Sequence, residues 1–354
     1  MRSNIEIPPG AFETTSPDSE SARDESLLWV AWSFHRRTDG LCAAWKIPLH
    51  VIRPEFAGPL RWVELSLKTL RLLRRTQPTT LFVQNPSLAL TILAVAVRPL
   101  FGYYLVVDAH NEGVRPFDRP YAFVRWLTRR VLKSADVTIV SNDALTKDVH
   151  EAGGRPLTLP DSLPKVPTSK SKSRRLRNIE TPDVVVIATY RRDEPIAAIV
   201  AAAATMPGIR FAITGAAMRY RETSGPLPPN VQLTGFLQDP DYWQLLARAT
   251  VICDLSLKSD CLVCGAYEAL AVGKPMVLSD NPATQEIFGP AAVLTGSSPE
   301  EIAKAFGRAL EDRNNLQANA LKLRETFPVR WQTEAAAVWD AIETKSVPGA
   351  GTAA

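Results

Sequence analysis

Two carboxylates lie in one short segment whose pattern predicts a strand, a loop, a helix and a second strand. An apolar run over 250–257 predicts the first strand, Asp260 lies in the loop, and Glu268 lies in a helix that ends at Gly273. An apolar run over 276–278 predicts the next strand. Open α/β sheets bind ligands beyond the carboxyl ends of their strands. The segment therefore predicts that Asp260 and Glu268 bind the hydroxyl groups of a ribose or sugar.

Each of these residues also has a purely structural interpretation. Glu268 could cap local amides or pair with an arginine, and Asp260 could cap the following helix. Cys264 and Gly265 open that helix with little side-chain bulk. Exposed amides at a helix N-terminus attract phosphate, and small residues let a ligand approach the backbone. Close packing of the helix on a strand is the alternative.

Four further candidates for binding a ligand follow predicted strands of the second half. Arg191 and Arg192 come after an apolar strand, and their planar guanidinium groups suit a diphosphate. Gly215 ends another strand in a Thr-Gly turn, where glycine allows a positive φ or a close backbone approach. Phe236 follows a second Thr-Gly pair and could border a base. The alternative for the arginine pair is a solvated pair facing neighbouring acids.

The first half contributes polar residues at two strand ends. His110 and Asn111 follow a strongly apolar strand, so His110 could reach substrate hydroxyls or a phosphate. The first strand is followed by Trp32, His35, Arg36 and Arg37, which could bind an acceptor, and Asn111 is a further acceptor candidate. A histidine satisfied by backbone carbonyls and an ordinary basic loop are the structural alternatives.

Short apolar runs alternate with helical stretches, which predicts two parallel sheets covered on both faces. Predicted strands of the first half are 27–31, 47–52, 79–83, 103–108, 137–140 and 157–159, with helices over 60–75, 87–97, 117–133 and 144–152. Predicted strands of the second half are 184–189, 210–214, 231–234, 250–254, 275–278 and 291–294, with helices over 195–205, 241–249, 265–272, 299–326 and 330–343.

The fold class expected is therefore α/β, with two Rossmann-like doubly wound domains facing a cleft. The predicted division is a disordered segment 1–25, a first Rossmann-like domain 26–160, a Pro-, Ser- and basic-rich linker 161–182, a second Rossmann-like domain 183–327, a helix 328–345 packing back on the first domain, and a disordered tail 346–354. The cleft between two such domains is the default active site.

Charge is distributed unevenly along the 354 residues, although the net charge is only +4. Residues 26–135 contain sixteen Lys and Arg against six Asp and Glu, which predicts an anionic partner for the first half. Basic amphipathic stretches around Trp62 and Trp126 could lie on anionic lipid or be ordinary helices with solvated faces. No nucleic-acid-binding motif accompanies the charge, so nucleic acid is not expected as a partner.

Several familiar catalytic motifs are missing from the sequence. The four cysteines include a C-x-x-C spacing at Cys261 and Cys264, but no second Cys/His pair completes a zinc site, and no metal is expected. The chain lacks a Walker A loop, a G-x-G-x-x-G after the first strand, H-E-x-x-H and G-x-S-x-G. These absences argue against a P-loop enzyme, a dinucleotide oxidoreductase, a zincin and an α/β-hydrolase.

Residues 268–280 resemble a sequence motif of the donor-binding domain of family-4-like GT-B glycosyltransferases. The residues are Glu-Ala-Leu-Ala-Val-Gly-Lys-Pro-Met-Val-Leu-Ser-Asp. The resemblance covers residues 183–295, and His110 is similar to the family's first-domain histidine. It implies that Glu268 binds the donor ribose, that Asp260 contacts the donor sugar and that Arg191 or Arg192 binds the diphosphate. The family's lysine five residues after its arginine has no counterpart, because Ile196 and Ala197 stand there.

The function expected is therefore transfer of a sugar from a UDP- or GDP-linked donor to an acceptor hydroxyl, without a metal or other cofactor. A sugar or lipid-linked acceptor, in polysaccharide or glycolipid assembly, is predicted at the inner face of the cytoplasmic membrane, and the chain is predicted to be cytoplasmic or peripheral there. A nucleotide-sugar 2-epimerase on the same fold and a non-catalytic partner subunit are the alternatives.

Overall fold

The computed structural model describes residues 26–346, except 86, 117–120, 169–175, 177–178 and 221–226. The disorder predicted for 1–25 and for most of 346–354 falls outside the described residues, as does much of the predicted linker 161–182. Ser346, which was assigned to the tail, is the last residue of the final helix.

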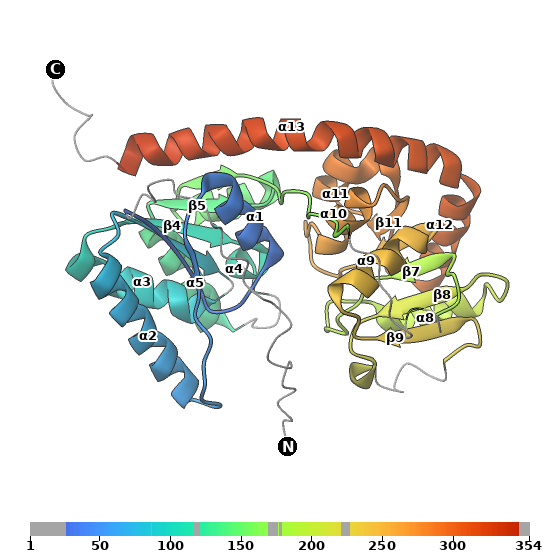
Figure 1. Cartoon of the computed structure of the whole chain (residues 1–354), viewed down its shortest axis with the longest axis horizontal. Helices are drawn as coiled ribbons and strands as arrows, with labels where there is room; N and C mark the ends of the chain where they lie inside the picture. The colour runs from blue at the N-terminus through green and yellow to red at the C-terminus, as the bar shows by residue number, and fades with distance from the viewer. Residues whose placement is uncertain are drawn as a thin grey trace.

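Two six-stranded sheets, all of whose strand pairs are parallel, confirm the predicted fold class (Figure 1). The first sheet has the order β2-β1-β3-β4-β5-β6 and contains β1 (Leu27–Ala31), β2 (Leu49–Val51), β3 (Thr80–Asn85), β4 (Tyr104–Ala109), β5 (Val137–Val140) and β6 (Pro156–Thr158). The second sheet has the order β12-β11-β10-β7-β8-β9 and contains β7 (Val184–Val186), β8 (Phe211–Thr214), β9 (Val231–Gly235), β10 (Val251–Asp254), β11 (Met276–Ser279) and β12 (Ala292–Thr295).

Helices connect the strands, as parallel pairing requires. In the first half these are α1 (Arg36–Trp45), α2 (Leu60–Thr76), α3 (Leu88–Phe101), α4 (Asn111–Val114), α5 (Ala122–Ser134) and α6 (Asp143–Glu151). In the second half they are α8 (Ile196–Ala204), α9 (Asp239–Arg248), α10 (Cys264–Ala271), α11 (Pro282–Phe288), α12 (Pro299–Glu311) and α13 (Arg313–Ser346), with single 3₁₀ turns at Ala217–Arg219 and Gly289–Ala291.

Central strands of the first sheet, such as β3 and β4, are buried on both faces. Successive side chains of a strand point to opposite sides, so each such strand contributes to two apolar layers. Along β1, Trp29 packs in one apolar cluster, whereas Leu28 and Val30 pack in another on the opposite face. The cluster that contains Trp29 also contains Val185 of the second sheet and Trp331 of α13. One continuous apolar core therefore joins the two sheets and the last helix.

Helix α13 lies across both halves of the molecule (Figure 1). Its Trp339 stacks on Phe82 of the first sheet, with ring centroids 6.4 Å apart. Trp331 Nε1 donates a hydrogen bond to the carbonyl of Pro160 at 2.8 Å, and Trp45 Nε1 donates to the carbonyl of Ala335 at 3.2 Å. The final helix thus anchors the second half to the first.

Candidate active site

Loops that follow the carboxyl ends of strands in the two sheets touch each other. Asn111 Nδ2, just after β4, donates a hydrogen bond to the carbonyl of Ser259, which follows β10, at 3.0 Å. Asn142 Nδ2, just after β5, donates to the carbonyl of Asp260 at 2.9 Å. This junction is the place where a parallel α/β sheet binds its ligands.

Glu268 lies on α10 with its carboxylate at this junction. The hydroxyl of Tyr242, on α9, donates a short hydrogen bond to Oε2. Arg36 of the first domain lies with Nε 3.3 Å from Oε1, and its Nη2 is 3.0 Å from Oδ1 of Asp239. The side chain of Glu268 is 8% exposed. The carboxylate predicted to bind a ribose therefore faces the opposite domain, and Arg36, predicted to bind an acceptor, contacts it directly.

Burial raises the pKa of Glu268, although the Tyr242 hydrogen bond and the Arg36 charge oppose the shift. A carboxylate can accept about four hydrogen bonds through its two oxygens. Tyr242 and Arg36 use one position on each oxygen, so acceptor capacity remains for the hydroxyls of a ligand.

Asp260 is held by the first domain. Its backbone adopts a left-handed conformation, with φ of 51°. Arg115 Nη1 lies 2.6 Å from Oδ2 of Asp260, and the same guanidinium also pairs with Asp148 of α6. The predicted catalytic acid is thus at the domain junction, where it forms an ion pair across the two domains.

Helix α10 begins against the end of β10. The amide of Gly265 donates a hydrogen bond to Oδ2 of Asp254 at 2.9 Å. A Cβ built on Gly265 would lie 2.3 Å from that oxygen and 2.8 Å from Cδ1 of Ile187. Close packing therefore requires glycine here, and Asp254 occupies the side of the helix start that faces the strand. Cys264, the first residue of the helix, is exposed.

Replacing Gly265 by alanine is expected to destabilise the protein by about 1–3 kcal/mol, because overpacking forces strand, helix and carboxylate apart. The matched control is Gly208→Ala, since a Cβ there has no atom within 4 Å. Thermal denaturation measures both variants. A melting temperature for Gly265→Ala equal to that of the control would contradict the packing assigned to this glycine.

The predicted diphosphate-binding residues lie after β7. Arg191 and Arg192 are exposed, and Nε of Arg191 lies 3.6 Å from Oδ1 of Asp193. Lys258 is largely buried and its Nζ lies 2.7 Å from both Glu112 of the first domain and Asp193. A cation that bridges the two domains is therefore present on the loop after β10, next to Asp260.

Gly215 and Phe236, the two candidates at turns after strands, lie in different environments. Gly215 has φ of +95°, and a Cβ there would lie 2.1 Å from the carbonyl oxygen of Ala188, so both features expected of this glycine are observed. Phe236 follows Gly235, whose φ is +70°, and is 52% exposed. Its ring is accessible to a ligand base, as the prediction requires.

A buried polar network lies beneath the first-domain candidates. Arg37 Nε lies 2.8 Å from Oδ1 of Asp108, and Arg37 Nη1 lies 2.7 Å from Oδ1 of Asp161. His110 Nε2 lies 3.4 Å from Oδ2 of Asp108 and its ring meets that of His35 edge-on at 4.1 Å. The network fixes the positions of both histidines at the end of β4 and the start of α1.

His35 caps helix α1 rather than lying in a basic loop. Its Nδ1 accepts a hydrogen bond from the amide of Arg37 at 3.2 Å. Burial, followed by the neighbouring His110, lowers the pKa of His35 from 6.5 to about 4. The imidazole is therefore neutral at pH 7, and its Nδ1 is free to accept the capping bond.

Because the folded pKa of His35 is below its unfolded value, stability is fully present above pH 6.5 and falls as the pH drops from 6.5 towards 4, by up to about 1.4 kcal/mol per pH unit. Asparagine retains a capping oxygen but does not titrate. Urea denaturation across this pH window should therefore show a shallower pH dependence for His35→Asn than for wild type. His150→Asn, at an exposed position on α6, is the control; equal slopes in all three proteins would refute the assignment.

Several residues of the site were not found from the sequence. Tyr242, Asp254 and Arg115 carry no motif, and their roles depend on partners elsewhere in the chain. Arg37 and Asp108 lie in segments that the sequence singles out, but nothing in the sequence shows that they form a buried ion pair. Asp254 at the end of β10 and Asp108 near the end of β4 are polar residues at strand ends, and this position is the signal that the sequence offers for them. Within the part of the chain that the structure describes, no group of three or more His, Cys, Asp or Glu side chains could hold a metal ion.

Comparisons with known proteins identify the fold. Residues 191–337 match the family described as glycosyl transferase-like. Sucrose-phosphate synthase from Thermosynechococcus elongatus superposes with a TM-score of 0.68 at 18% identity, over 83% of this chain and 82% of that one. The chain has the GT-B glycosyltransferase fold. The GT-B resemblance inferred from residues 268–280 is thereby confirmed.

Two further structures are similar to this chain along most of their length. Anabaena HepE, solved with UDP and glucose, has a TM-score of 0.69 at 15% identity, over 90% of this chain and 99% of that one. The UDP-GlcNAc 2-epimerase of Neisseria meningitidis has a TM-score of 0.58 at 15% identity, over 88% and 90%. No curated protein sequence matches the chain.

Proposed function

We propose that this protein transfers a sugar from a nucleoside diphosphate sugar to an acceptor hydroxyl. The observation that carries the proposal is Glu268, a buried carboxylate on the first helix after β10 that faces the opposite domain and retains acceptor capacity. The glycosyl transferase-like match over 191–337 supports the same reading. In this proposal Glu268 binds the ribose hydroxyls of the donor.

The other residues of the site would take part in the transfer reaction around the ribose-binding Glu268. The bond between the anomeric carbon and the diphosphate oxygen breaks, a bond from that carbon to the acceptor oxygen forms, and the proton of the acceptor hydroxyl passes to the departing diphosphate. Negative charge grows on the diphosphate, where the arginines after β7 and Lys258 would stabilise it without a metal ion. His110 and Asp260 are the proposed catalytic groups on the two sides of the transferred sugar.

A panel of UDP- and GDP-linked sugars tests the proposal. Ligands that prefer the native state raise its melting temperature, so a donor should give a concentration-dependent shift. UDP-glucose is the first candidate, because HepE structures contain UDP or UDP-glucose. If no member of either series binds below millimolar concentration, the proposed function is wrong.

A nucleotide-sugar 2-epimerase is the second candidate, because two epimerases share the fold. The two functions differ in their need for an acceptor. Incubation with a donor alone, followed by product analysis, should leave the sugar of a transferase donor with its configuration intact. If the nucleotide sugar is epimerised instead, the proposed activity is isomerisation and not sugar transfer.

We further propose that the acceptor is presented at an anionic membrane surface, on the cytoplasmic side. Helix α5 exposes Phe123 and Trp126, whose rings stack 5.9 Å apart, and Arg130 lies over Trp126. On α2, Arg61 lies over the partly exposed Trp62. Interfacial helices combine such aromatic and basic side chains. In the described residues, no helix has the length and apolarity needed to span a bilayer.

The double variant Phe123→Ser/Trp126→Ser is expected to lose most of its sedimentation with vesicles that contain phosphatidylglycerol, because both apolar anchors are removed. Met218→Ser, at a highly exposed position of the second domain, serves as the control and should bind like wild type. Binding should weaken at high salt. Wild-type protein that stays in the supernatant at low salt would rule out the membrane proposal.

A further inference from the structure

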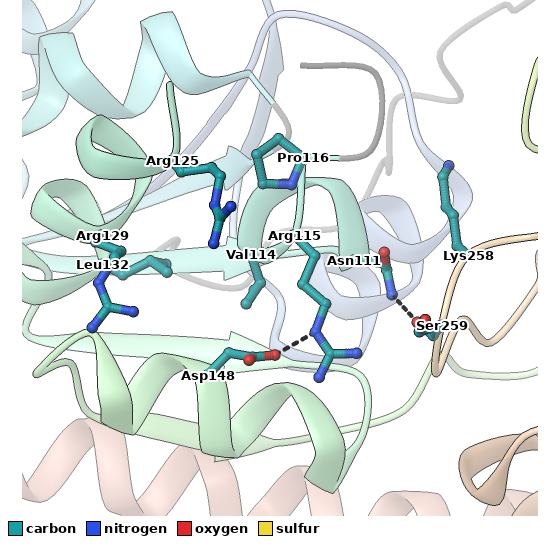
Figure 2. Close-up of a pocket in the computed structure, with 10 residues that line it drawn as sticks. All are labelled: Asn111, Val114, Arg115, Pro116, Arg125, Arg129, Leu132, Asp148, Lys258 and Ser259. Carbon is teal, nitrogen blue, oxygen red and sulfur yellow. Dashed lines mark hydrogen bonds and ion pairs between the residues drawn. The ribbon is translucent and has the colours of Figure 1, made fainter. Parts of the chain in front are cut away.

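A pocket of about 380 Å³ lies beside the domain junction, on the first-domain side (Figure 2). Its walls come from α4, α5 and α6 and from the loop after β10. Four cationic side chains and one carboxylate line it, together with three apolar residues and two neutral polar ones. The lining residues are Asn111, Val114, Arg115, Pro116, Arg125, Arg129, Leu132, Asp148, Lys258 and Ser259.

The four cations are not equivalent. Arg115 is held by Asp148 and Asp260, and Lys258 by Glu112 and Asp193. Arg129 donates a hydrogen bond to the carbonyl of Glu151. In the described part of the chain, neither Arg125 nor Arg129 forms an ion pair with a carboxylate, and Figure 2 shows both extending from α5 on the same side of Arg115. Two exposed guanidinium groups that pair with no carboxylate of the described residues therefore line the pocket.

The pocket is also placed beside the residues of the proposed site. Asn111 adjoins His110 and contacts Ser259, and Lys258 and Ser259 immediately precede Asp260. Pockets of 300–1,000 Å³ hold small molecules, and apolar walls with a few charged groups fix their orientation. Val114, Pro116 and Leu132 supply such walls here.

We propose that this pocket binds a phosphate or diphosphate group of the acceptor, with Arg125 and Arg129 as its main ligands. The inference rests on the proposed sugar transfer, to which it adds the chemical class of the second substrate. Arginine matches the oxygens of phosphate through paired hydrogen bonds. Arg115 and Lys258, already paired with carboxylates, form the wall towards the second domain. The acceptor's hydroxyl then projects from the pocket towards Asp260.

The test is isothermal titration of inorganic pyrophosphate into protein saturated with UDP, which fills the donor's own diphosphate position. Each hydrogen bond to a charged group is worth about tenfold in affinity. The double variant Arg125→Gln/Arg129→Gln should therefore bind pyrophosphate at least tenfold more weakly than wild type. Arg130→Gln/Lys133→Gln removes the same charge from the same helix but no pocket-lining residue, and should bind within twofold of wild type.

Equal losses of pyrophosphate affinity in the two double variants would overturn the proposal, because the overall charge of the helix would then account for binding. Unchanged affinity in both double variants would also overturn it. Affinity for UDP alone, measured in the same proteins, should be unchanged by either double variant. If wild type binds no nucleotide or nucleotide sugar, the proposed function is wrong. The pyrophosphate titration without UDP then still tests whether the pocket binds a phosphate group.

A second arm of the test distinguishes the sources of the phosphate group. A polyprenyl diphosphate in phosphatidylcholine vesicles should compete with pyrophosphate if the group belongs to a lipid headgroup. Glucose 1-phosphate should compete if it belongs to a soluble sugar phosphate. In either case competition must disappear in Arg125→Gln/Arg129→Gln; competition that persists there contradicts the pocket.

Discussion

Replacing Glu268 by glutamine is expected to weaken nucleotide-sugar binding about a hundredfold while leaving the fold intact. A hydrogen bond to a charged group contributes about 1.5–3 kcal/mol, and a ribose offers two hydroxyls to one carboxylate. Each 1.4 kcal/mol is tenfold in affinity. Because burial raises the pKa of Glu268, an uncharged amide is tolerated at this position. Titration calorimetry with the tightest-binding donor measures the loss.

Glu311→Gln is the matched control, since this residue is an exposed glutamate at the end of α12. It should bind donor as wild type does. Circular dichroism and thermal denaturation of Glu268→Gln must resemble those of wild type for the affinities to be compared. A donor affinity within threefold of wild type in a folded Glu268→Gln protein would remove this residue from the binding site.

Replacing Arg37 by methionine is expected to destabilise the protein by about 3–5 kcal/mol. Arg37 and Asp108 are both buried, with side chains 1% and 0% exposed. Although burial alone would lower the pKa of Arg37, the carboxylates of Asp108 and Asp161 raise it. Removing one partner of a buried pair leaves the other charge uncompensated. The melting temperature should fall on the order of 10 °C.

The neighbouring residue provides the control for this stability measurement. Arg36→Met removes an arginine whose side chain is 37% exposed, so its ion pairs are screened by solvent. Its melting temperature should fall by no more than a few degrees. If Arg36→Met and Arg37→Met have the same melting temperature, the buried network beneath the histidines does not stabilise the first domain.

Most of the fold could be predicted, because parallel strands buried on both faces read as short apolar runs between helical stretches. Helix α1 was missed because its sequence contains Thr38, Asp39 and Gly40, which are weak helix formers, and its cap is a histidine. The end of the chain was predicted as two helices that part before Arg330. The structure instead begins α13 at Arg313 and continues it through Pro328, where packing of α13 on both halves outweighs proline's local preference.

The candidate site could be predicted only in part. Glu268 was identifiable because an acid in an otherwise apolar segment needs a partner. Arg36 and Arg37 looked alike in the sequence, yet one reaches the opposite domain and the other is buried beneath the site. That difference arises because successive residues of a helix point in different directions, and α1 itself was not predicted. Tyr242 and Arg115 gain their roles from partners 26 and 145 residues away in the chain.

The most direct test of the central claim compares UDP, or GDP if that is the preferred nucleotide, with its 2′,3′-dideoxy analogue in wild type and in Glu268→Gln. If Glu268 binds the ribose hydroxyls, wild type should prefer the natural nucleotide by about a hundredfold, and Glu268→Gln should bind the two nearly equally. Undiminished discrimination in the variant would show that the ribose is bound elsewhere and would contradict the account.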